Sequence, residues 1–318
     1  MQERYNSFNT FLRNKFKGLK IRKIPINAGF PCPNKSKQPG LPDKGCIFCD
    51  DFGSGPIRGF NLSITEQINA FTGERGQFKK KDIKYIAYYQ AHSNTSAPVE
   101  TLREKYEIIF TFPEIVGLFI GTRPDAISPD VYPLLEELNQ RTYLTVELGL
   151  QSIHARSLQF LNRNHTYEQF LDTFHRLTEK NIAVIVHLII GIPGETTEEM
   201  LATIKEMNRI KPAGIKFHLL HVLKNTGLYD MYKQGEIKLL EKDDYVNLVV
   251  ILLEHLDPEI VIHRLTGERD KELFYAPLWA MNKNEVIQSI RDTMEECDTF
   301  QGKSFKAELC SKKNFLLC

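Results

Sequence analysis

The stretch Cys32-Pro33-Asn34, followed after a gap by Gly45-Cys46-Ile47-Phe48-Cys49, decides how the rest of the chain is interpreted. It places three thiols in one segment near the start of the chain. A structural zinc site takes four ligands, usually as two ligand pairs. No fourth ligand is evident nearby, since the first histidine is His92 and the remaining cysteines are Cys297, Cys310 and Cys318.

Three thiolates suit a four-iron, four-sulfur cluster whose fourth iron is left open, because iron–sulfur clusters are held by cysteine thiolates. An open iron binds a further ligand, so such a site indicates chemistry rather than structural support. Two alternatives remain at this point: a zinc loop that takes a distant fourth ligand, and three unrelated buried thiols. We predict the cluster, with Cys32, Cys46 and Cys49 as its ligands.

Composition and charge set the class of protein. The chain has 318 residues, of which 42% are hydrophobic and 25% charged, as in an ordinary globular protein with a sizeable core. No run of eighteen apolar residues occurs and the first residues lack an apolar signal region, so we expect a cytoplasmic protein with no membrane partner. A reducing compartment also suits cysteines kept for metal rather than for disulfides.

The net charge of +1 gives no global field that would attract nucleic acid, but basic residues gather at both ends of the chain. Residues 1–24 hold seven Lys or Arg against the single Glu3, with aromatic side chains interleaved. A second basic cluster comprises Lys303, Lys306, Lys312 and Lys313. Such segments can bind phosphates and stack on bases. The alternative, which we favour, is an amphipathic helix whose aromatics dock on the protein and whose charges face water.

Beyond the cysteines the chain alternates between apolar strands and helices. A short strand at 21–27 leads into the cysteine segment, and Ser63-x-x-Glu66 is a capping box that opens a helix to about Phe78. Further strands are predicted at 83–90, 115–121, 143–150, 182–190, 215–220 and 260–265, and helices at 98–112, after 128, at 155–162, 166–180, 196–210 and 242–256. This alternation implies parallel βα units covered on both faces, and so an α/β barrel or partial barrel.

Polar residues recur where the predicted strands end, which is where α/β barrels place their chemistry. They are Gln90, His92 and Asn94, then Arg123 and Asp125, then Glu147 and Gln151, then His187 and Gly191, and finally Lys216, His218 and His221. Because strand side chains alternate, Glu147 and Gln151 share one face. Each has a structural explanation alone: Arg123 and Asp125 could pair at a helix start, and His187 could be a satisfied core histidine. Because such residues recur at the same end of successive strands, we predict that they form a functional site.

These motifs resemble those of radical S-adenosylmethionine (radical SAM) enzymes, in the branch that contains the Elongator catalytic subunit and the YhcC/YtqA-type bacterial proteins. Phe48 before the last cysteine is typical of the superfamily, and the thirteen residues between Cys32 and Cys46 are similar to that branch. Further similar segments are 29–34, 121–125, 147–152, 162–165, 190–195, 263–267, 276–279 and 298–302. The resemblance runs from about residue 5 to 303.

The resemblance implies an α/β fold, a partial (β/α)6 TIM-like barrel with a small C-terminal extension. We expect a basic N-terminal helix within 1–24, a radical SAM core in 25–240 and a C-terminal subdomain in 241–318 that completes the barrel. The implied cofactors are a 4Fe-4S cluster and S-adenosylmethionine (SAM). Residues expected to contact SAM are Gln90, Asn94, Arg123, Glu147, Gln151, His187 and Gly191, although Gln90 to Asn94 departs from the usual Gly-Gly-Glu form. No catalytic residue is assigned.

The resemblance also implies that a reduced cluster cleaves SAM and that the resulting 5′-deoxyadenosyl radical abstracts hydrogen from a substrate. Relatives in the branch act on tRNA wobble uridine, so we expect tRNA as substrate, with conversion of a carboxymethylaminomethyl group at carbon 5 to aminomethyl as one hypothesis. The 318 residues include no acetyltransferase-sized extension, so the Elongator subunit's full reaction is not expected. A reductant such as flavodoxin or ferredoxin is the implied partner. Alternatives are a radical SAM enzyme acting on a small metabolite or peptide, and a non-catalytic, zinc-stabilised nucleic-acid-binding protein.

Overall fold

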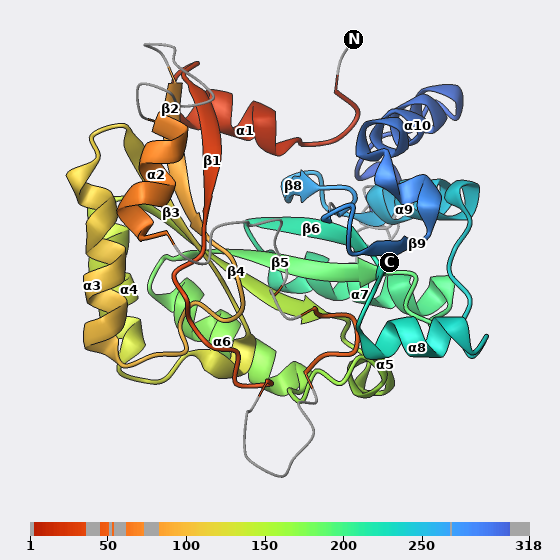
Figure 1. Ribbon diagram of the computed structural model, residues 1–318. Helices are drawn as coiled ribbons and strands as arrows, with labels where there is room; N and C mark the ends of the chain where they lie inside the picture. Colours follow the sequence, from red (N-terminus) through yellow and green to blue (C-terminus); the bar gives the residue numbers. More distant parts are fainter. Residues whose placement is uncertain are drawn as a thin grey trace, which may run out of the picture. The chain divides into compact units, whose positions relative to one another are not determined.

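Strands and helices alternate along most of the chain in the computed structural model, which describes residues 3–35, 45–50, 53, 62–72, 83–267 and 269–305. Seven strands form one sheet in the order β1-β2-β3-β4-β5-β6-β8 (Figure 1). The pairs β1–β2, β2–β3, β3–β4 and β6–β8 are parallel. The strand–helix alternation predicted from the sequence is therefore confirmed.

The sheet consists of β1 (Lys20–Ile26), β2 (Ile83–Tyr89), β3 (Ile115–Thr122), β4 (Tyr143–Gln151), β5 (Ala183–Ile190), β6 (Gly214–Leu219) and β8 (Val261–Arg264). The α-helices are α1 (Phe8–Lys15), α2 (Ile64–Thr72), α3 (Val99–Glu107), α4 (Val131–Arg141), α5 (Ala155–Phe160), α6 (Tyr167–Glu179), α7 (Thr197–Ile210), α8 (Gly227–Lys233), α9 (Lys242–His255) and α10 (Lys283–Glu296). Helices α8 and α10 were not predicted. Nor was a small antiparallel sheet of β7 (Val222–Leu223) and β9 (Phe274–Ala276), because strands of two or three residues carry no periodic pattern.

Capping boxes begin α7 and, as predicted above, α2. The backbone nitrogen of Glu199 donates to the Thr196 hydroxyl at 3.3 Å, and that of Thr196 donates to the Glu199 carboxylate at 2.9 Å. Ser63 and Glu66 form the same reciprocal pair before α2. The predicted end of that helix near Phe78 lies outside the described residues, as do the expected basic residues Lys306, Lys312 and Lys313 and the two C-terminal cysteines.

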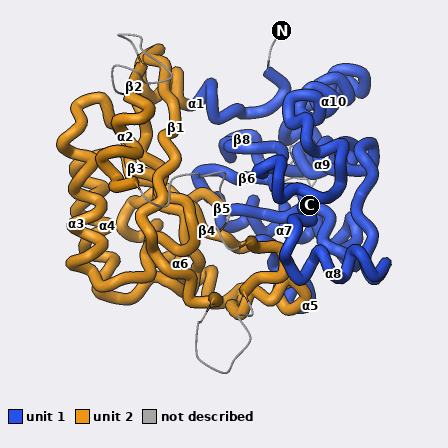
Figure 2. The backbone as a smooth tube through the Cα atoms, in the orientation of Figure 1, with its two compact units in different colours: residues 1–11, 151–157, 187–318 blue, residues 12–150, 158–186 orange. Residues whose placement is uncertain are grey.

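The chain divides into two compact units, drawn in different colours in Figure 2. Unit 1 comprises residues 1–11, 151–157 and 187–318, and unit 2 comprises residues 12–150 and 158–186. In unit 2, α3 and α4 pack together, and the parallel register places Gly121 of β3 opposite Glu147 of β4. In unit 1, α9 packs against both α7 and α10. The expected domain boundaries near residues 24 and 240 stay a prediction.

The aromatic side chains of the basic N-terminal segment pack on the protein. The Phe16 ring meets that of Tyr143 edge-on at 6.0 Å, and the Lys15 ammonium lies 4.1 Å from the centre of the same ring. Phe8 stacks on His263 with ring centroids 3.9 Å apart. Lys17 and Lys20 are exposed. These contacts agree with the docked amphipathic segment that we favoured from the sequence.

No described helix has the length and apolar character needed to cross a membrane.

Candidate functional site

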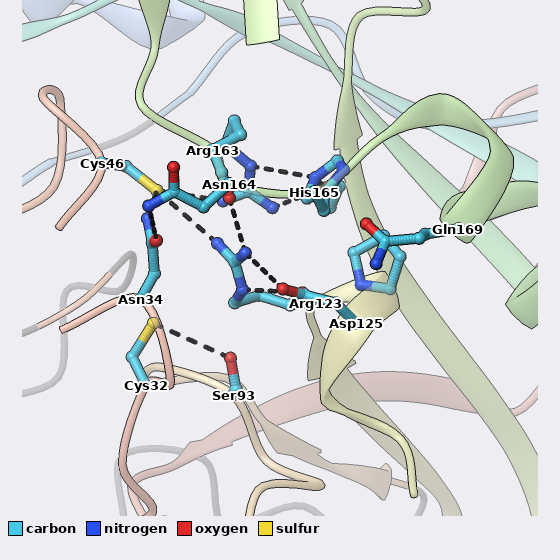
Figure 3. A network of polar contacts seen from close by, with 12 residues as sticks. Cys32, Asn34, Cys46, Ser93, Arg123, Asp125, Arg163, Asn164, His165 and Gln169 are labelled. Atoms are coloured by element: carbon cyan, nitrogen blue, oxygen red, sulfur yellow. Dashed lines mark hydrogen bonds and ion pairs between the residues drawn. The ribbon is translucent and has the colours of Figure 1, made fainter. Parts of the chain in front are cut away.

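Cys46 lies at the centre of a polar network in unit 2 (Figure 3). The residue is 6% exposed, and its sulfur faces the Asn34 amide nitrogen at 3.2 Å, Nη1 of Arg163 at 3.3 Å and Nη1 of Arg123 at 3.9 Å. Burial alone would raise the pKa of Cys46. The two guanidinium groups and the hydrogen bonds from Arg163 and Asn34 outweigh it and lower that pKa below its ordinary value. The network thus favours the thiolate, which is the form that binds metal.

The two arginines beside Cys46 are themselves held by hydrogen bonds. Arg163 donates from Nη2 to the Gly149 carbonyl at 2.6 Å. Arg123 makes a two-pronged contact with Asp125, at 2.9 and 2.8 Å, and donates to the Arg163 carbonyl at 2.5 Å. The predicted pairing of Arg123 with Asp125 is therefore present, and the same arginine also faces the thiol. Both charges sit in fixed positions next to Cys46.

His165 orients Arg163 as a neutral imidazole. Burial, and then the charges of Arg163 and Arg123, lower the pKa of His165 to about 4. Nε of Arg163 donates to Nε2 of His165 at 3.2 Å, and the same Nε2 lies 3.2 Å from the Gly149 carbonyl. Nδ1 of His165 lies 3.3 Å from the Thr166 carbonyl. The ring therefore helps to hold the Arg163 guanidinium in place.

The segment 161–165 holds the cysteine loop, by which we mean residues 32–35 and 45–50. Asn162 donates its side-chain amide to the Gly45 carbonyl at 2.9 Å, and its own carbonyl accepts from Asn34 at 2.7 Å. Asn164 donates to the Asn34 side-chain oxygen at 2.6 Å. Asn162 and Asn164 have φ angles of 51° and 52°, a left-handed conformation that asparagine tolerates better than most residues. Both halves of the loop are thus tied to one segment.

The other two cysteines are half-buried, and the hydroxyl of Ser93 lies 3.9 Å from the Cys32 sulfur. Among the residues that the structure describes, no three His, Cys, Asp or Glu side chains converge tightly enough for a single metal ion. Three sulfur donors, one of them stabilised as a thiolate, fit a cluster better than mononuclear zinc.

Four of the residues expected to contact SAM lie in unit 2. Arg123 is brought to Cys46, as described above. Asn94 is fully buried and donates its amide to the Gly121 carbonyl at 2.8 Å, while its side-chain oxygen has no hydrogen-bond partner among the described residues. Gln90 is half-buried and donates its backbone nitrogen to Ile26 at 3.2 Å. The buried Glu147 side chain pairs with Lys23 at 3.3 Å.

The remaining three expected SAM contacts lie in unit 1. Gln151 ends β4 with a φ angle of 77°, a strained conformation for a residue other than glycine. Gly191 has a φ angle of 83°, and a Cβ there would lie 2.7 Å from Cδ1 of Leu240. His187 lies beside His218, with ring centroids 5.0 Å apart. Contact of these seven residues with SAM stays a prediction.

Asn34, Arg163 and His165 were not predicted as site residues, although their segments were recognised as motifs. A usable signal existed in the four consecutive polar residues Asn162-Arg163-Asn164-His165, which directly follow a short helix. Two of them are buried as far as core residues, at 6% for Arg163 and 5% for His165. Buried polar side chains of this kind need specific partners, and here the partner is the cysteine loop.

Two family models match the chain: that of the radical SAM superfamily over residues 43–207 and that of the radical SAM C-terminal domain over residues 212–296. The YtqA protein of Bacillus subtilis is 41% identical over 307 residues, which cover 96% of this chain and 94% of that protein. The tRNA uridine(34) acetyltransferase of Methanocaldococcus jannaschii is 30% identical over 55% of this chain and 33% of its own length. Among solved structures, the Elp3 protein of Methanocaldococcus infernus has a TM-score of 0.55 at 21% identity, covering 69% of this chain and 55% of that one.

The structural similarity confirms the predicted fold class, a parallel α/β partial barrel of the radical SAM type. The family matches confirm that the protein is an enzyme and that its cofactors are a 4Fe-4S cluster and SAM. The alternative of a non-catalytic zinc protein is left without support. By its family matches and its relatives along nearly the whole chain, the protein belongs to the radical SAM superfamily.

Proposed function

We propose that the protein modifies tRNA, converting a carboxymethylaminomethyl group at carbon 5 of the wobble uridine to an aminomethyl group. The observation that supports this most is the similarity to a tRNA uridine(34) acetyltransferase at 30% identity over 184 residues. That similarity covers 33% of the relative, so it bears on the shared segment and not on the acetyl transfer itself.

We further propose that Cys32, Cys46 and Cys49 hold the cluster and leave one iron open for SAM. When bound, the cluster and SAM supply a 5′-deoxyadenosyl radical that abstracts hydrogen. Residues of the chain keep Cys46 in the ionised form that binds iron. Arg163 and Asn34 keep Cys46 ionised by donating to its sulfur at 3.3 and 3.2 Å, and the burial of Cys46 keeps water away from it.

The proposed reaction balances in atoms and electrons. The side chain –CH2–NH–CH2–COO⁻ loses one hydrogen atom from its glycyl methylene to the adenosyl radical. The substrate radical would then give up one electron, returned to the cluster to replace the one spent in cleaving SAM, and the nitrogen would lose its proton to water, which leaves an imine. Water adds to the imine carbon and the carbon–nitrogen bond breaks, which releases glyoxylate and leaves the aminomethyl group. One SAM is consumed for each uridine converted.

Nucleoside analysis of tRNA tests this proposal. The reconstituted protein is incubated without oxygen with SAM, a reductant and tRNA that carries carboxymethylaminomethyluridine at position 34. We expect aminomethyluridine, glyoxylate and 5′-deoxyadenosine in equal amounts. A protein that cleaves SAM but neither binds this tRNA nor changes its nucleosides would refute the proposed substrate while leaving the enzyme class intact.

Substitution of the exposed basic residues of the N-terminal segment distinguishes tRNA modification from action on a small metabolite or peptide. The aromatics of the segment are docked on the protein, while Arg13, Lys17 and Lys20 are exposed and so positioned for phosphates rather than bases. Neutralising these three charges should weaken tRNA binding and reduce its dependence on salt. An enzyme for a small metabolite or peptide would lose no activity on the same change.

A further inference from the structure

A second group of polar side chains lies in unit 1, at the carboxyl ends of β6 and β8, where His221 is buried and His218 is half-buried. His218 is in β6, His221 follows the end of that strand, and Gly267 follows the end of β8. A Cβ at Gly267 would lie 2.9 Å from Cε1 of His221 and 3.7 Å from Nδ1 of His218. Both imidazole rings therefore approach the same glycine, whose lack of a side chain lets the backbone pass. We call His218 and His221 the histidine pair.

Both members of the histidine pair have an unused hydrogen-bonding atom. Their Nε2 atoms are buried, and neither has a hydrogen-bond partner among the residues that the structure describes. His221 as a whole is only 5% exposed. Buried polar atoms without partners are costly and uncommon, and those that persist in native proteins require an explanation such as a bound ligand. Two such atoms on neighbouring rings indicate a binding site.

The electrostatic surroundings of the pair identify the kind of ligand. Burial, followed by the charges of Arg269 and Arg264, lowers the pKa of His221 to about 3. Burial, followed by His187, Arg264, Arg269 and Lys216, lowers the pKa of His218 well below its ordinary value. Both rings are thus neutral at pH 7, and among the described residues Arg264, Arg269 and Lys216 place positive charge near them. A neutral N–H donor amid positive charge favours an anionic oxygen.

We infer that His218 and His221 donate hydrogen bonds from Nε2 to the carboxylate of the substrate's side chain. This inference rests on the proposed function, in which the modified uridine carries a carboxymethylamino group. The burial of both Nε2 atoms favours that carboxylate over a backbone phosphate, because a base extruded from its stack enters the protein whereas the backbone stays outside. Holding the carboxylate would also fix the position of the adjoining methylene, which is the carbon that loses hydrogen.

Titration with small probes tests the site without tRNA and without turnover. The full-length protein, labelled with 15N in its histidines, is titrated with N-methylglycine, with N-methylglycinamide and with inorganic phosphate. His218→Gln and His221→Gln identify the two sets of imidazole signals. We expect N-methylglycine to shift both sets and the uncharged amide to shift neither. A shift with phosphate alone, or no shift with any probe, would overturn the inference.

Matched variants test the site with the proposed substrate. One anticodon stem-loop carries carboxymethylaminomethyluridine and another carries plain uridine. His221→Leu removes the donor, His221→Gln retains one, and His175→Leu makes the same change at an exposed histidine of α6. We expect His221→Leu to weaken binding of the modified stem-loop at least about tenfold, as for a lost hydrogen bond to a charged group, and to leave binding of the plain one and of SAM unchanged. His221→Gln should restore most of the affinity.

The outcomes distinguish the two proposals. Equal losses for both stem-loops would assign the pair to the tRNA backbone or to folding, and weaker SAM binding would assign it to the cofactor. Either result overturns the inference while leaving the proposed function in place. If the unchanged protein binds neither stem-loop, the proposed function fails, whereas a response to N-methylglycine would still show a carboxylate site.

Discussion

The cysteine loop of unit 2 and the histidine pair of unit 1 are both buried groups of titratable side chains, yet their hydrogen bonds are arranged in opposite ways. Around Cys46, Asn34 and Arg163 donate to the sulfur and are in turn held by partners within the same unit. The histidine pair has Nε2 atoms without partners in the described part of the chain. In our proposals the first group awaits a metal, and the second is open to a ligand.

The comparison shows that positively charged side chains have two different effects in this chain. Next to Cys46, the guanidinium groups of Arg163 and Arg123 lower the pKa of a thiol and so stabilise a negative charge that the protein itself supplies. Next to the histidine pair, burial and then the charges of Arg269 and Arg264 lower the pKa of His221 and keep the ring neutral, and in our inference the substrate supplies the negative charge.

Substitution of Arg163 should lower the unfolding free energy more than any other change proposed here. Arg163→Met deletes the donors to Cys46 and to the Gly149 carbonyl and leaves a buried thiolate with less compensation. We expect a loss of about 3–5 kcal/mol in unfolding free energy, as for breaking a buried charged pair, together with poor retention of iron. Denaturant unfolding and iron analysis measure both. Arg176→Met, at an exposed ion pair of α6, is the control, and equal effects of the two changes would contradict the account.

The ion pair of the half-buried Lys23 and the buried Glu147 tests whether Glu147 serves SAM or the fold. Glu147→Gln removes the negative charge that faces the Lys23 ammonium and should cost about 2–3 kcal/mol, whereas adding Lys23→Met should recover part of that loss. Breaking the exposed pair of Arg103 and Glu137 should cost much less, because water screens exposed ion pairs. Calorimetry with SAM decides the role: affinity that falls in Glu147→Gln and in the double variant alike supports the predicted contact. Unchanged SAM affinity in both variants would show that Glu147 supports the fold and does not contact SAM.

The histidine pair should make the protein less stable in mild acid. The pKa of His221 is about 3 in the folded protein and about 6.5 in an unfolded chain. Between these values the unfolded chain binds a proton that the folded protein does not, so stability is complete above about pH 6.5 and declines as pH falls toward 3. For this group alone we expect a loss of about 2 kcal/mol between pH 7.5 and pH 5. Urea unfolding of His221→Gln should show a smaller decline, and parallel pH profiles would contradict the prediction.

A smaller effect is expected from Asn34→Asp, which keeps the shape of the side chain and removes its amide donor. The change breaks the contacts with the Cys46 sulfur and the Asn162 carbonyl and sets a carboxylate beside a thiolate. We expect a loss of about 1–3 kcal/mol and faster release of iron to a chelator. Asn139→Asp, which removes an exposed donor to the Asn181 carbonyl, provides the matched control. Iron release at the same rate in both variants would show that Asn34 does not support the loop.

The sequence predicted the fold well because its signals were local and periodic. Apolar strands such as β5 and capping boxes such as that of Thr196 are visible in short windows, and the strand–helix alternation followed from them. The site was predicted less fully. The spacing of the cysteines was readable, but the contact between Arg163 and Cys46 joins residues 117 positions apart in the chain, and only folding brings them together. The two-residue strand β7 likewise depends on its distant partner β9 rather than on any pattern of its own.

The most direct test of the central claim is anaerobic reconstitution with iron and sulfide, followed by metal analysis, a visible spectrum and an assay for 5′-deoxyadenosine. The account predicts a brown protein that binds iron and sulfide in equal amounts and cleaves SAM, and it predicts that Cys32→Ala, Cys46→Ala and Cys49→Ala each abolish both properties. Cys297→Ala, at an exposed cysteine, should change neither. A colourless protein that binds zinc and leaves SAM intact, or a Cys46→Ala variant with full activity, would contradict it.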